Sequence, residues 1–217
     1  MTRRTTINRT IRNLLVLVCL SASAGVLAAA EPISFKGGYT RAVMREGRET
    51  IMLTQGAMVS TGSIEFQAQS IELIGPNARY MVGTGSVTIT DTENNIVITC
   101  TSISFDRETE QLLVDGWVEV QDLENEVIAS GAYLSYNRSD GTMKLQIAAK
   151  LLRHTGSGPM VCRADSIEYN RNTMRLALVG NTSIAWKGDT YQASATTVNL
   201  ETDEIIMEGS IEGIVHG

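Results

Sequence analysis

The chain has 217 residues, with 18 basic and 24 acidic side chains and a net charge of −6 at pH 7. This acidic balance argues against a nucleic-acid partner, because affinity for nucleic acid depends on neutralising phosphates with Lys and Arg. The length suffices for one sizeable domain with a continuous core.

The first thirty residues have the order of a secretory signal peptide. Four arginines precede an apolar run over 14–20, and small residues follow, ending in Ala28-Ala29-Ala30. We expect cleavage after Ala30 and a periplasmic location, and the apolar run is too short for a membrane span. Cleavage would leave 14 basic against 24 acidic residues, a net charge of −10. Lipid attachment at Cys19 is less favoured, because the preceding Val18 is not small.

From Ile33 onward the sequence repeats at intervals of about 31 residues. The first apolar pairs of the five repeats are Ile71/Leu73, Ile103/Phe105, Leu134/Tyr136, Ile167/Tyr169 and Val198/Leu200. A polar turn follows four of them, and each turn leads into a second alternating run, such as Leu112/Val114 and Met143/Leu145/Ile147. A unit that cannot bury its own apolar face must stack on its neighbours.

Alternation with period two, together with frequent turn residues, predicts an all-β fold. Two long strands in each repeat, joined by a charged turn, favour stacked antiparallel strands in an elongated, open jelly roll over a parallel β-helix. No linker interrupts the repeats, so residues 31–217 are expected to form a single domain.

The repeats resemble the OstA-like family, the periplasmic domain of the lipopolysaccharide transport proteins LptA and LptC and of the N-terminal part of LptD. The resemblance depends on the phrase Ala164-Asp165-Ser166-Ile167-Glu168-Tyr169-Asn170, followed by Leu176-Ala177-Leu178-Val179-Gly180, and on weaker copies between about residues 33 and 213. The second repeat departs from it with Cys100-Thr101 in place of Ala-Asp, and the third has Ile147 where Gly is typical.

The resemblance implies an apolar interior that accepts acyl chains and edge strands that add end to end to other OstA-like domains. The implied cargo is lipopolysaccharide or a related glycolipid, and the C-terminal run from Ile205 to Ile214 would leave its last strand available to a partner. The candidate lipid-binding residues of the interior wall are Ile71, Leu73, Ile103, Phe105, Leu112, Val114, Leu134, Tyr136, Met143, Leu145, Ile167, Tyr169, Leu176, Leu178, Val198, Leu200 and Met207.

The alternative for each of these residues is that they pack only on one another. The chain would then be a structural or scaffolding β-protein of the cell envelope that carries nothing. Either way we expect no enzyme, since no catalytic constellation, metal-ligand spacing or cofactor loop is present in the sequence. Cys100 and Cys162 lie 62 residues apart, about two repeats, and are interpreted as two small buried thiols.

Overall fold

The computed structural model describes residues 31–216, and the predicted signal peptide with Cys19 lies outside these residues. The described part of the chain confirms the all-β prediction. Its strands are β1 (Ile33–Lys36), β2 (Tyr39–Val43), β3 (Thr50–Thr61), β4 (Ile64–Ile74), β5 (Tyr80–Asp91), β6 (Ile96–Asp106), β7 (Gln111–Asp122), β8 (Val127–Asn137), β9 (Thr142–Thr155), β10 (Gly158–Asn170), β11 (Arg175–Trp186), β12 (Asp189–Asn199), β13 (Glu204–Glu208) and β14 (Glu212–Ile214). One 3₁₀ turn, η1 (Pro76–Ala78), joins β4 to β5.

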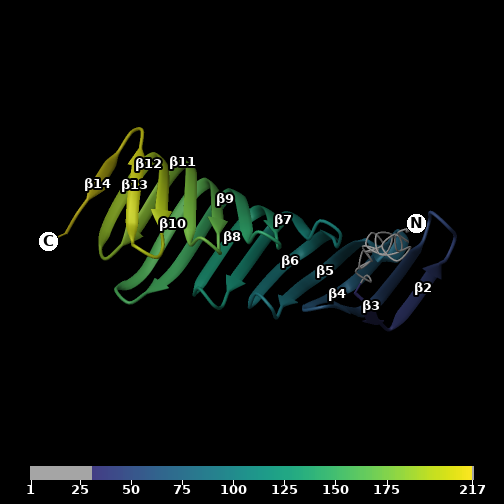
Figure 1. Cartoon of the computed structure of the whole chain (residues 1–217). Coiled ribbons are helices and arrows are strands. Elements are labelled where there is room, and N and C mark those ends of the chain that lie inside the picture. The colour runs from purple at the N-terminus through teal and green to yellow at the C-terminus, as the bar shows by residue number, and fades with distance from the viewer. Residues whose placement is uncertain (1–30, 217) are drawn as a thin grey trace, which may run out of the picture. The chain divides into compact units, whose positions relative to one another are not determined.

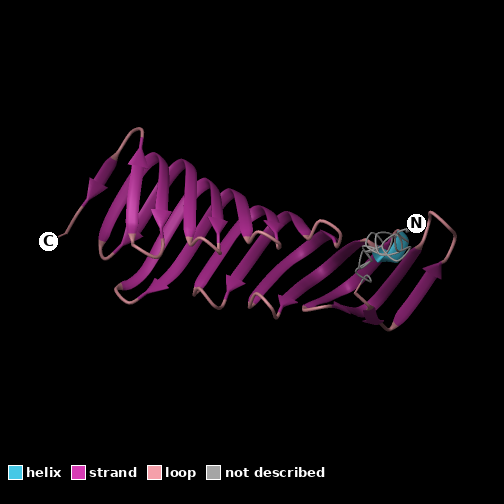
Figure 2. Cartoon of the chain, viewed as in Figure 1, coloured by secondary structure: helices cyan, strands magenta, loops and turns pink. Residues whose placement is uncertain are grey.

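All fourteen strands belong to one antiparallel sheet in which β3 to β12 follow one another in chain order (Figures 1 and 2). Each strand from β4 to β11 therefore pairs with the strand that precedes it in the chain and with the strand that follows it. β1 and β2 pair only with β3, whereas β13 and β14 pair only with β12. The sheet is consequently open, with a free edge at each end, as the sequence predicts. Among residues 31–216, no helix has the length and apolar character that a membrane crossing requires.

Six of the turns start from an Asp or Asn at the end of a strand. The Asp91 carboxylate accepts hydrogen bonds from the backbone N–H groups of Glu93 and Asn94, and the Asn170 side chain accepts one from Thr173 N–H. Such side chains stabilise a tight turn by satisfying its free N–H groups. The same bond recurs at Asp106, Asp122, Asn137 and Asn199.

Every long strand bends near its middle, where the pairing register shifts. In the odd-numbered strands the bend contains residues with positive φ, such as Gly85 and Ser86 in β5 and Gly180 and Asn181 in β11. At each shift the odd-numbered strand also holds one residue more than its even-numbered partner, as where two residues of β9 between Gln146 and Ala149 face one residue of β10 between Ala164 and Ser166. The bends divide each strand into two halves.

The inner side of the bend in the even-numbered strands is occupied by small residues. Ala68, Gly131, Ala164 and Ala193 are buried there, and the half-buried Cys100 occupies the equivalent position in β6. We attribute the small size to the narrow space on the inside of a sharp bend. The departure from the family phrase at Cys100 thus keeps a small side chain where one is needed.

We call the strand halves that adjoin the β3–β4, β5–β6, β7–β8, β9–β10 and β11–β12 hairpins the first arm. The other strand halves form the second arm. The first arm includes residues 57–61, 64–68, 87–91, 96–100, 118–122, 127–130, 149–155, 158–164, 182–186 and 189–193; the second includes residues 50–54, 70–74, 80–84, 102–106, 111–115, 133–137, 142–146, 166–170, 175–179 and 195–199.

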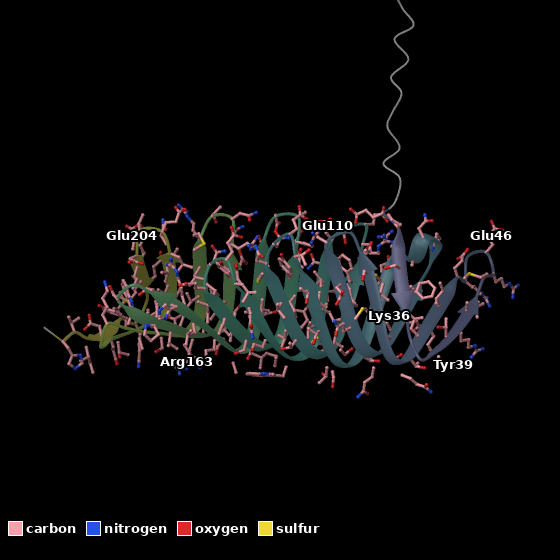
Figure 3. All side chains as sticks on the ribbon, turned by 90° about the horizontal axis from the view of Figure 1, so that it is seen from below. Lys36, Tyr39, Glu46, Glu110, Arg163 and Glu204 are labelled. Atoms are coloured by element: carbon pink, nitrogen blue, oxygen red, sulfur yellow. The ribbon has the colours of Figure 1, made fainter. Side chains whose placement is uncertain are left out.

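The two arms face each other across the core. Phe66 of the first arm stacks on Phe105 of the second, with ring centroids 5.7 Å apart, although their strands β4 and β6 are separated by β5. In Figure 3, the turn residue Glu110 and Glu204, which follows a turn, lie along one margin, and Arg163 and Tyr39, which adjoin bends, lie along the opposite margin. The sheet is therefore creased at its bends, and the apolar faces of its two arms enclose the core.

Candidate functional site: an apolar interior closed by an arginine seam

The candidate wall residues lie together on the inner face of the second arm and the turn that follows it. Sixteen of the seventeen are buried, each no more than 3% exposed, and they belong to one hydrophobic core. Met207 differs, because it lies on β13 at the open end of the sheet and is only half-buried. The structure thus brings the predicted wall together, and contact of that wall with lipid stays a prediction.

The opposite wall comes from the first arm and was not predicted. The sequence does contain a signal for this second wall. Apolar and polar residues alternate again beyond each bend, as in Val118/Val120 after Leu112/Val114. The residues of this wall include Val59, Ile64, Phe66, Val87, Ile89, Ile96, Ile98, Val118, Val120, Val127, Ala129, Leu151, Met160, Cys162 and Ile184.

Ile147 does not join the interior, although its run alternates with Met143 and Leu145. It is 65% exposed and has φ of 62°, and the next residue, Ala148, has φ of 54°. Alternation with period two ends here, because the backbone bends at this point and turns the side chain outward. Left-handed backbone is costly for a β-branched residue, which explains why Gly occupies the equivalent site in β5, β7 and β11.

The cysteine interpretation is partly correct. Both thiols are free, and Cys162 is buried, but Cys100 is only half-buried. Cys100 is on β6 and Cys162 on β10, so four strand spacings of ~4.8 Å separate them by roughly 19 Å. That distance is well beyond the reach of a disulfide.

The interior is closed on the side opposite the crease by two rows of turns. The first row contains the turns at residues 62–63, 92–95, 123–126, 156–157 and 187–188, and the second row those at 75–79, 107–110, 138–141, 171–174 and 200–203. We call the line where the two rows meet the seam. Four arginines bridge it, namely Arg107, Arg138, Arg153 and Arg171.

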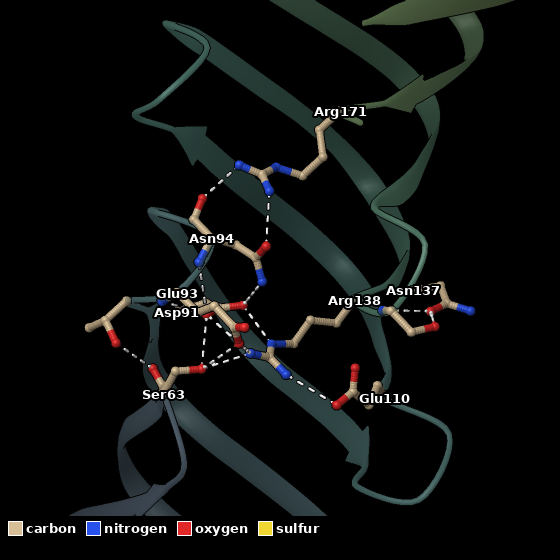
Figure 4. Close-up of polar contacts among 10 residues, drawn as sticks. Ser63, Asp91, Glu93, Asn94, Glu110, Asn137, Arg138 and Arg171 are labelled. Atoms are coloured by element: carbon tan, nitrogen blue, oxygen red, sulfur yellow. Dashed lines mark hydrogen bonds and ion pairs between the residues drawn. The ribbon is translucent and has the colours of Figure 1, made fainter. Parts of the chain in front are cut away.

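Arg138, in the second row, makes the densest set of contacts across the seam (Figure 4). Its Nε donates to Asp91 Oδ2 at 2.6 Å, and its Nη2 donates to Glu93 Oε2 at 2.6 Å and to Ser63 Oγ at 2.7 Å. Its Nη1 donates to Glu110 Oε1 within its own row at 3.2 Å. The side chains of Arg138 and Asp91 are 11% and 5% exposed, so this ion pair is nearly buried.

Arg171 repeats this arrangement one unit further along the chain. Its Nε donates to Asp122 Oδ2 at 3.2 Å, and its Nη2 donates to Glu124 Oε2 and to the Asn94 carbonyl, both in the first row. The Tyr169 hydroxyl, below the turn, donates to the same Asp122 oxygen at 3.1 Å. Asp122 is only 1% exposed.

The two outer bridges lack a close ion pair. Arg107 donates to Thr61 Oγ1 and to the Glu31 carbonyl. Arg153 runs in the reverse direction, from the first arm to the Leu200 carbonyl in the second row, with the Asp203 carboxylate 3.8 Å away. The seam is therefore held most strongly by its two middle arginines.

The pKa values of the middle bridges follow from this geometry. Burial by itself raises the pKa of Asp91, but the hydrogen bonds from Arg138 and Asn94 outweigh it and hold that pKa below its ordinary value of 3.8. Burial likewise lowers the pKa of the Arg138 guanidinium, and its bonds to Asp91 more than compensate, so the pKa is raised. Both groups are consequently ionised at neutral pH.

Tyr136 and Tyr169 differ although they are equivalent residues of adjacent repeats. The Tyr136 hydroxyl is buried and has no hydrogen-bond partner, whereas Tyr169 donates to Asp122. The equivalent acceptor for Tyr136 is Asp91, which already accepts bonds from Arg138, Asn94, Glu93 and Ser63. Burial raises the pKa of Tyr136, so its hydroxyl stays protonated.

Arg107, Arg138 and Arg171 fall within turns and Arg153 within β9, and no bridging role was predicted for them. A usable signal existed, since Arg107, Arg138 and Arg171 each follow directly after the Asp or Asn that ends a strand. Across residues 31–216, no group of three or more His, Cys, Asp and Glu side chains gathers in a way that could hold a metal ion.

No protein-family model matches the chain, and no curated protein matches it in sequence. Among solved structures, the chain is similar to LptH from Pseudomonas aeruginosa, described as the LptA homologous periplasmic component of the conserved lipopolysaccharide transport device. The identity is 8%, the TM-score is 0.25, and the match covers 86% of this chain and 96% of that chain. These values do not establish a common family.

Proposed function

We propose that this chain is a periplasmic, non-enzymatic protein that binds lipopolysaccharide or a related glycolipid and moves it between the inner and outer membranes. The acyl chains would occupy the space between the two arms. The observation that carries the proposal is the continuous apolar core, which extends from β3 to β12 without an intervening polar layer. Such an interior desolvates lipid tails with a gain of roughly 0.8 kcal/mol for each buried methylene group.

The ends of the sheet support the bridging part of the proposal. Register places Phe35 of β1 opposite the buried Val59 and Met207 of β13 opposite the buried Thr196, so both continue the inner face. Phe35 is nevertheless 46% exposed and Met207 only half-buried. The free edges of β1, β2, β13 and β14 would add to the edges of other OstA-like domains end to end. The interior would then continue from one domain to the next.

Photocrosslinking tests the lipid-binding role. A benzophenone amino acid at Phe105, Tyr136 or Tyr169 should capture lipopolysaccharide in cells that make it, since these side chains line the interior. The same group at Ser104 or Glu168, which are exposed neighbours on the same strands, serves as the matched control and should capture none. Capture at the control positions alone, or at none of the five, would contradict the proposal.

A crosslinker on the free edge tests the end-to-end contact separately. Ile206 lies on β13 and is 51% exposed, whereas Leu113 is 39% exposed on the internal strand β7. A benzophenone amino acid at Ile206 should capture an OstA-like domain, and one at Leu113 should not. Equal capture at both positions would contradict strand addition at this end.

A structural or scaffolding role is the second candidate, and one observation favours it. The interior side chains already pack on each other, as shown by the 0–3% exposure of the sixteen wall residues, and the seam closes over them. Mass spectrometry of the protein purified from its native envelope separates the two functions. Co-purified glycolipid supports the carrier, and its repeated absence supports the scaffold.

A further inference from the structure

The boundary of the interior differs in strength from place to place. Across both arms, neighbouring strands are joined by ladders of backbone hydrogen bonds, which are interrupted only at the register shifts along the crease. At the seam, the backbone bonds between turns run along each row, for example from Leu123 N–H to the Asn95 carbonyl in the first row and from Arg138 N–H to the Glu110 carbonyl in the second. Among residues 31–216, no backbone–backbone bond between turns crosses from one row to the other.

Side chains alone therefore hold the two rows together. The contacts are those of Arg107, Arg138, Arg153 and Arg171, with the Tyr169–Asp122 bond beneath. When an ion pair such as Arg138–Asp91 or Arg171–Asp122 separates, both ions return to water and regain their hydration. This hydration offsets much of the lost attraction between them. Parting the rows breaks no strand pairing, whereas opening the sheet anywhere else breaks a ladder.

The charges around Arg138 also favour two distinct states of the seam, one closed and one open. Arg138 lies among three carboxylates: Asp91 at the end of β5 and Glu93 in the adjoining first-row turn lie on one side of the seam, and Glu110 in the second row lies on the other. While Arg138 remains in place, it attracts all three and closes the seam. When it swings away, the carboxylates of the two rows face each other with like charge and repel.

Two unpartnered polar atoms lie along the same line. Within residues 31–216, three buried side-chain N and O atoms lack a hydrogen-bond partner; of these, the Tyr136 hydroxyl lies close to the Arg138–Asp91 pair, and Arg153 Nε belongs to one of the two outer bridges. A closed seam thus leaves buried polar groups unsatisfied, which costs free energy that opening would recover by hydration. Hydration of the Tyr136 hydroxyl and of Arg153 Nε would therefore lower the free energy needed to part the rows.

From these contacts we propose that the seam is a lateral opening, through which acyl chains enter and leave the interior sideways while the sheet stays intact. The proposal rests on the proposed lipid-binding function, but opening of the seam can be measured without lipid. The alternative route for a lipid tail is through the open ends of the sheet.

A covalent lock across the seam tests the proposal. Glu93 and Glu110 lie in opposite rows, and both bond to the Arg138 guanidinium, so a short bifunctional maleimide can span cysteines at these positions. The full chain carries Glu93→Cys and Glu110→Cys, with Cys19 and Cys100 replaced by Ala. The matched control joins Glu110→Cys to Ser139→Cys, both in the second row, so that it adds a cross-link without bridging the seam.

The first measurement is labelling of Cys162, which is 0% exposed, by a small thiol reagent at pH 8. The lock should slow labelling at least tenfold relative to the control cross-link. Urea unfolding of both cross-linked proteins determines how much of the labelling comes from global unfolding. Equal labelling of both proteins would overturn the proposal.

The second measurement is uptake of a fluorescent fatty acid with an 18-carbon chain. We expect uptake at least tenfold slower in the locked protein than in the control. Equally fast uptake in both proteins overturns the lateral route and leaves the proposed lipid-binding function standing, with entry through the sheet ends. Slowed Cys162 labelling with no uptake by any form overturns the lipid function, although the seam then still opens.

Discussion

Arg138 Nε donates to Asp91 Oδ2 at 2.6 Å and thereby joins two turns that lie at opposite ends of their strands. The two residues are 47 positions apart in sequence and lie on hairpins that share no strand. This contact shows that the creased sheet brings its two rows of turns together. It also provides the sharpest test of how the seam contributes to stability.

Replacing Arg138 with Gln should lower the free energy of unfolding by about 3 kcal/mol, because it leaves the buried Asp91 charge without its main partner. Replacing Glu93 with Gln is the matched control and should change it by less than about 0.5 kcal/mol, since that carboxylate is 69% exposed. Urea unfolding followed by circular dichroism measures both. Equal losses of unfolding free energy in the two variants would show that the buried Arg138–Asp91 pair stabilises the protein no more than the exposed Arg138–Glu93 pair.

The Asp91 carboxyl also predicts a pH dependence. Because its pKa is lowered in the folded protein, its contribution is complete above the unfolded value near 3.9 and is lost as the pH falls through the folded pKa. The stability difference between the wild-type protein and Asp91→Asn should therefore be constant from pH 7 to 5 and shrink below about pH 4. Urea midpoints at pH 7, 5, 4 and 3 provide the comparison. A difference that stays constant down to pH 3 would rule out this coupling.

The equivalent tyrosines should respond in opposite ways to loss of the hydroxyl. Tyr136→Phe removes a buried hydroxyl that has no partner, so stability should be unchanged or rise by up to about 1 kcal/mol. Tyr169→Phe removes the bond to Asp122 and should cost about 1.5 kcal/mol. Thermal or urea unfolding of the two single variants tests the pair, and similar effects in both would contradict the assigned bonding.

Ile147→Gly should stabilise the protein by about 0.5–1 kcal/mol, although most substitutions to Gly within strands are destabilising. The native φ of 62° strains a β-branched residue by about 1–2 kcal/mol, and the 65% exposed side chain loses little burial. Ile128→Gly provides the control at an exposed strand position without positive φ and should be destabilising. A loss of stability at both positions would mean that the Ile147 side chain makes a contact worth more than the strain.

The cysteines should react in a fixed order. Burial raises the pKa of Cys162 to about 12 and that of Cys100 to about 11, so both thiols are protonated at pH 7.5. Cys100 is half-buried and should be labelled first by a maleimide, with Cys162 at least tenfold slower. Peptide mass spectrometry after timed labelling identifies each site, and a Cys100–Cys162 disulfide in the native protein would contradict the described fold.

The sequence by itself determined the all-β class, the repeat and one wall of the interior. These features are local, because alternation along a strand depends only on which face each side chain takes. Ile167 and Tyr169, or Leu176 and Leu178, could therefore be assigned to the inner face before any contact was known. The Asp and Asn residues that begin the turns are local signals of the same kind.

Only the tertiary structure decided where the strands bend, and the bends determine everything else about the site. They turn Ile147 outward, place Phe66 against Phe105 and bring Arg138 within reach of Asp91. None of these contacts has a signature within one strand, since each joins residues from different hairpins. The physical reason is that a crease acts on all strands at once, so its consequences appear only when the whole sheet is assembled.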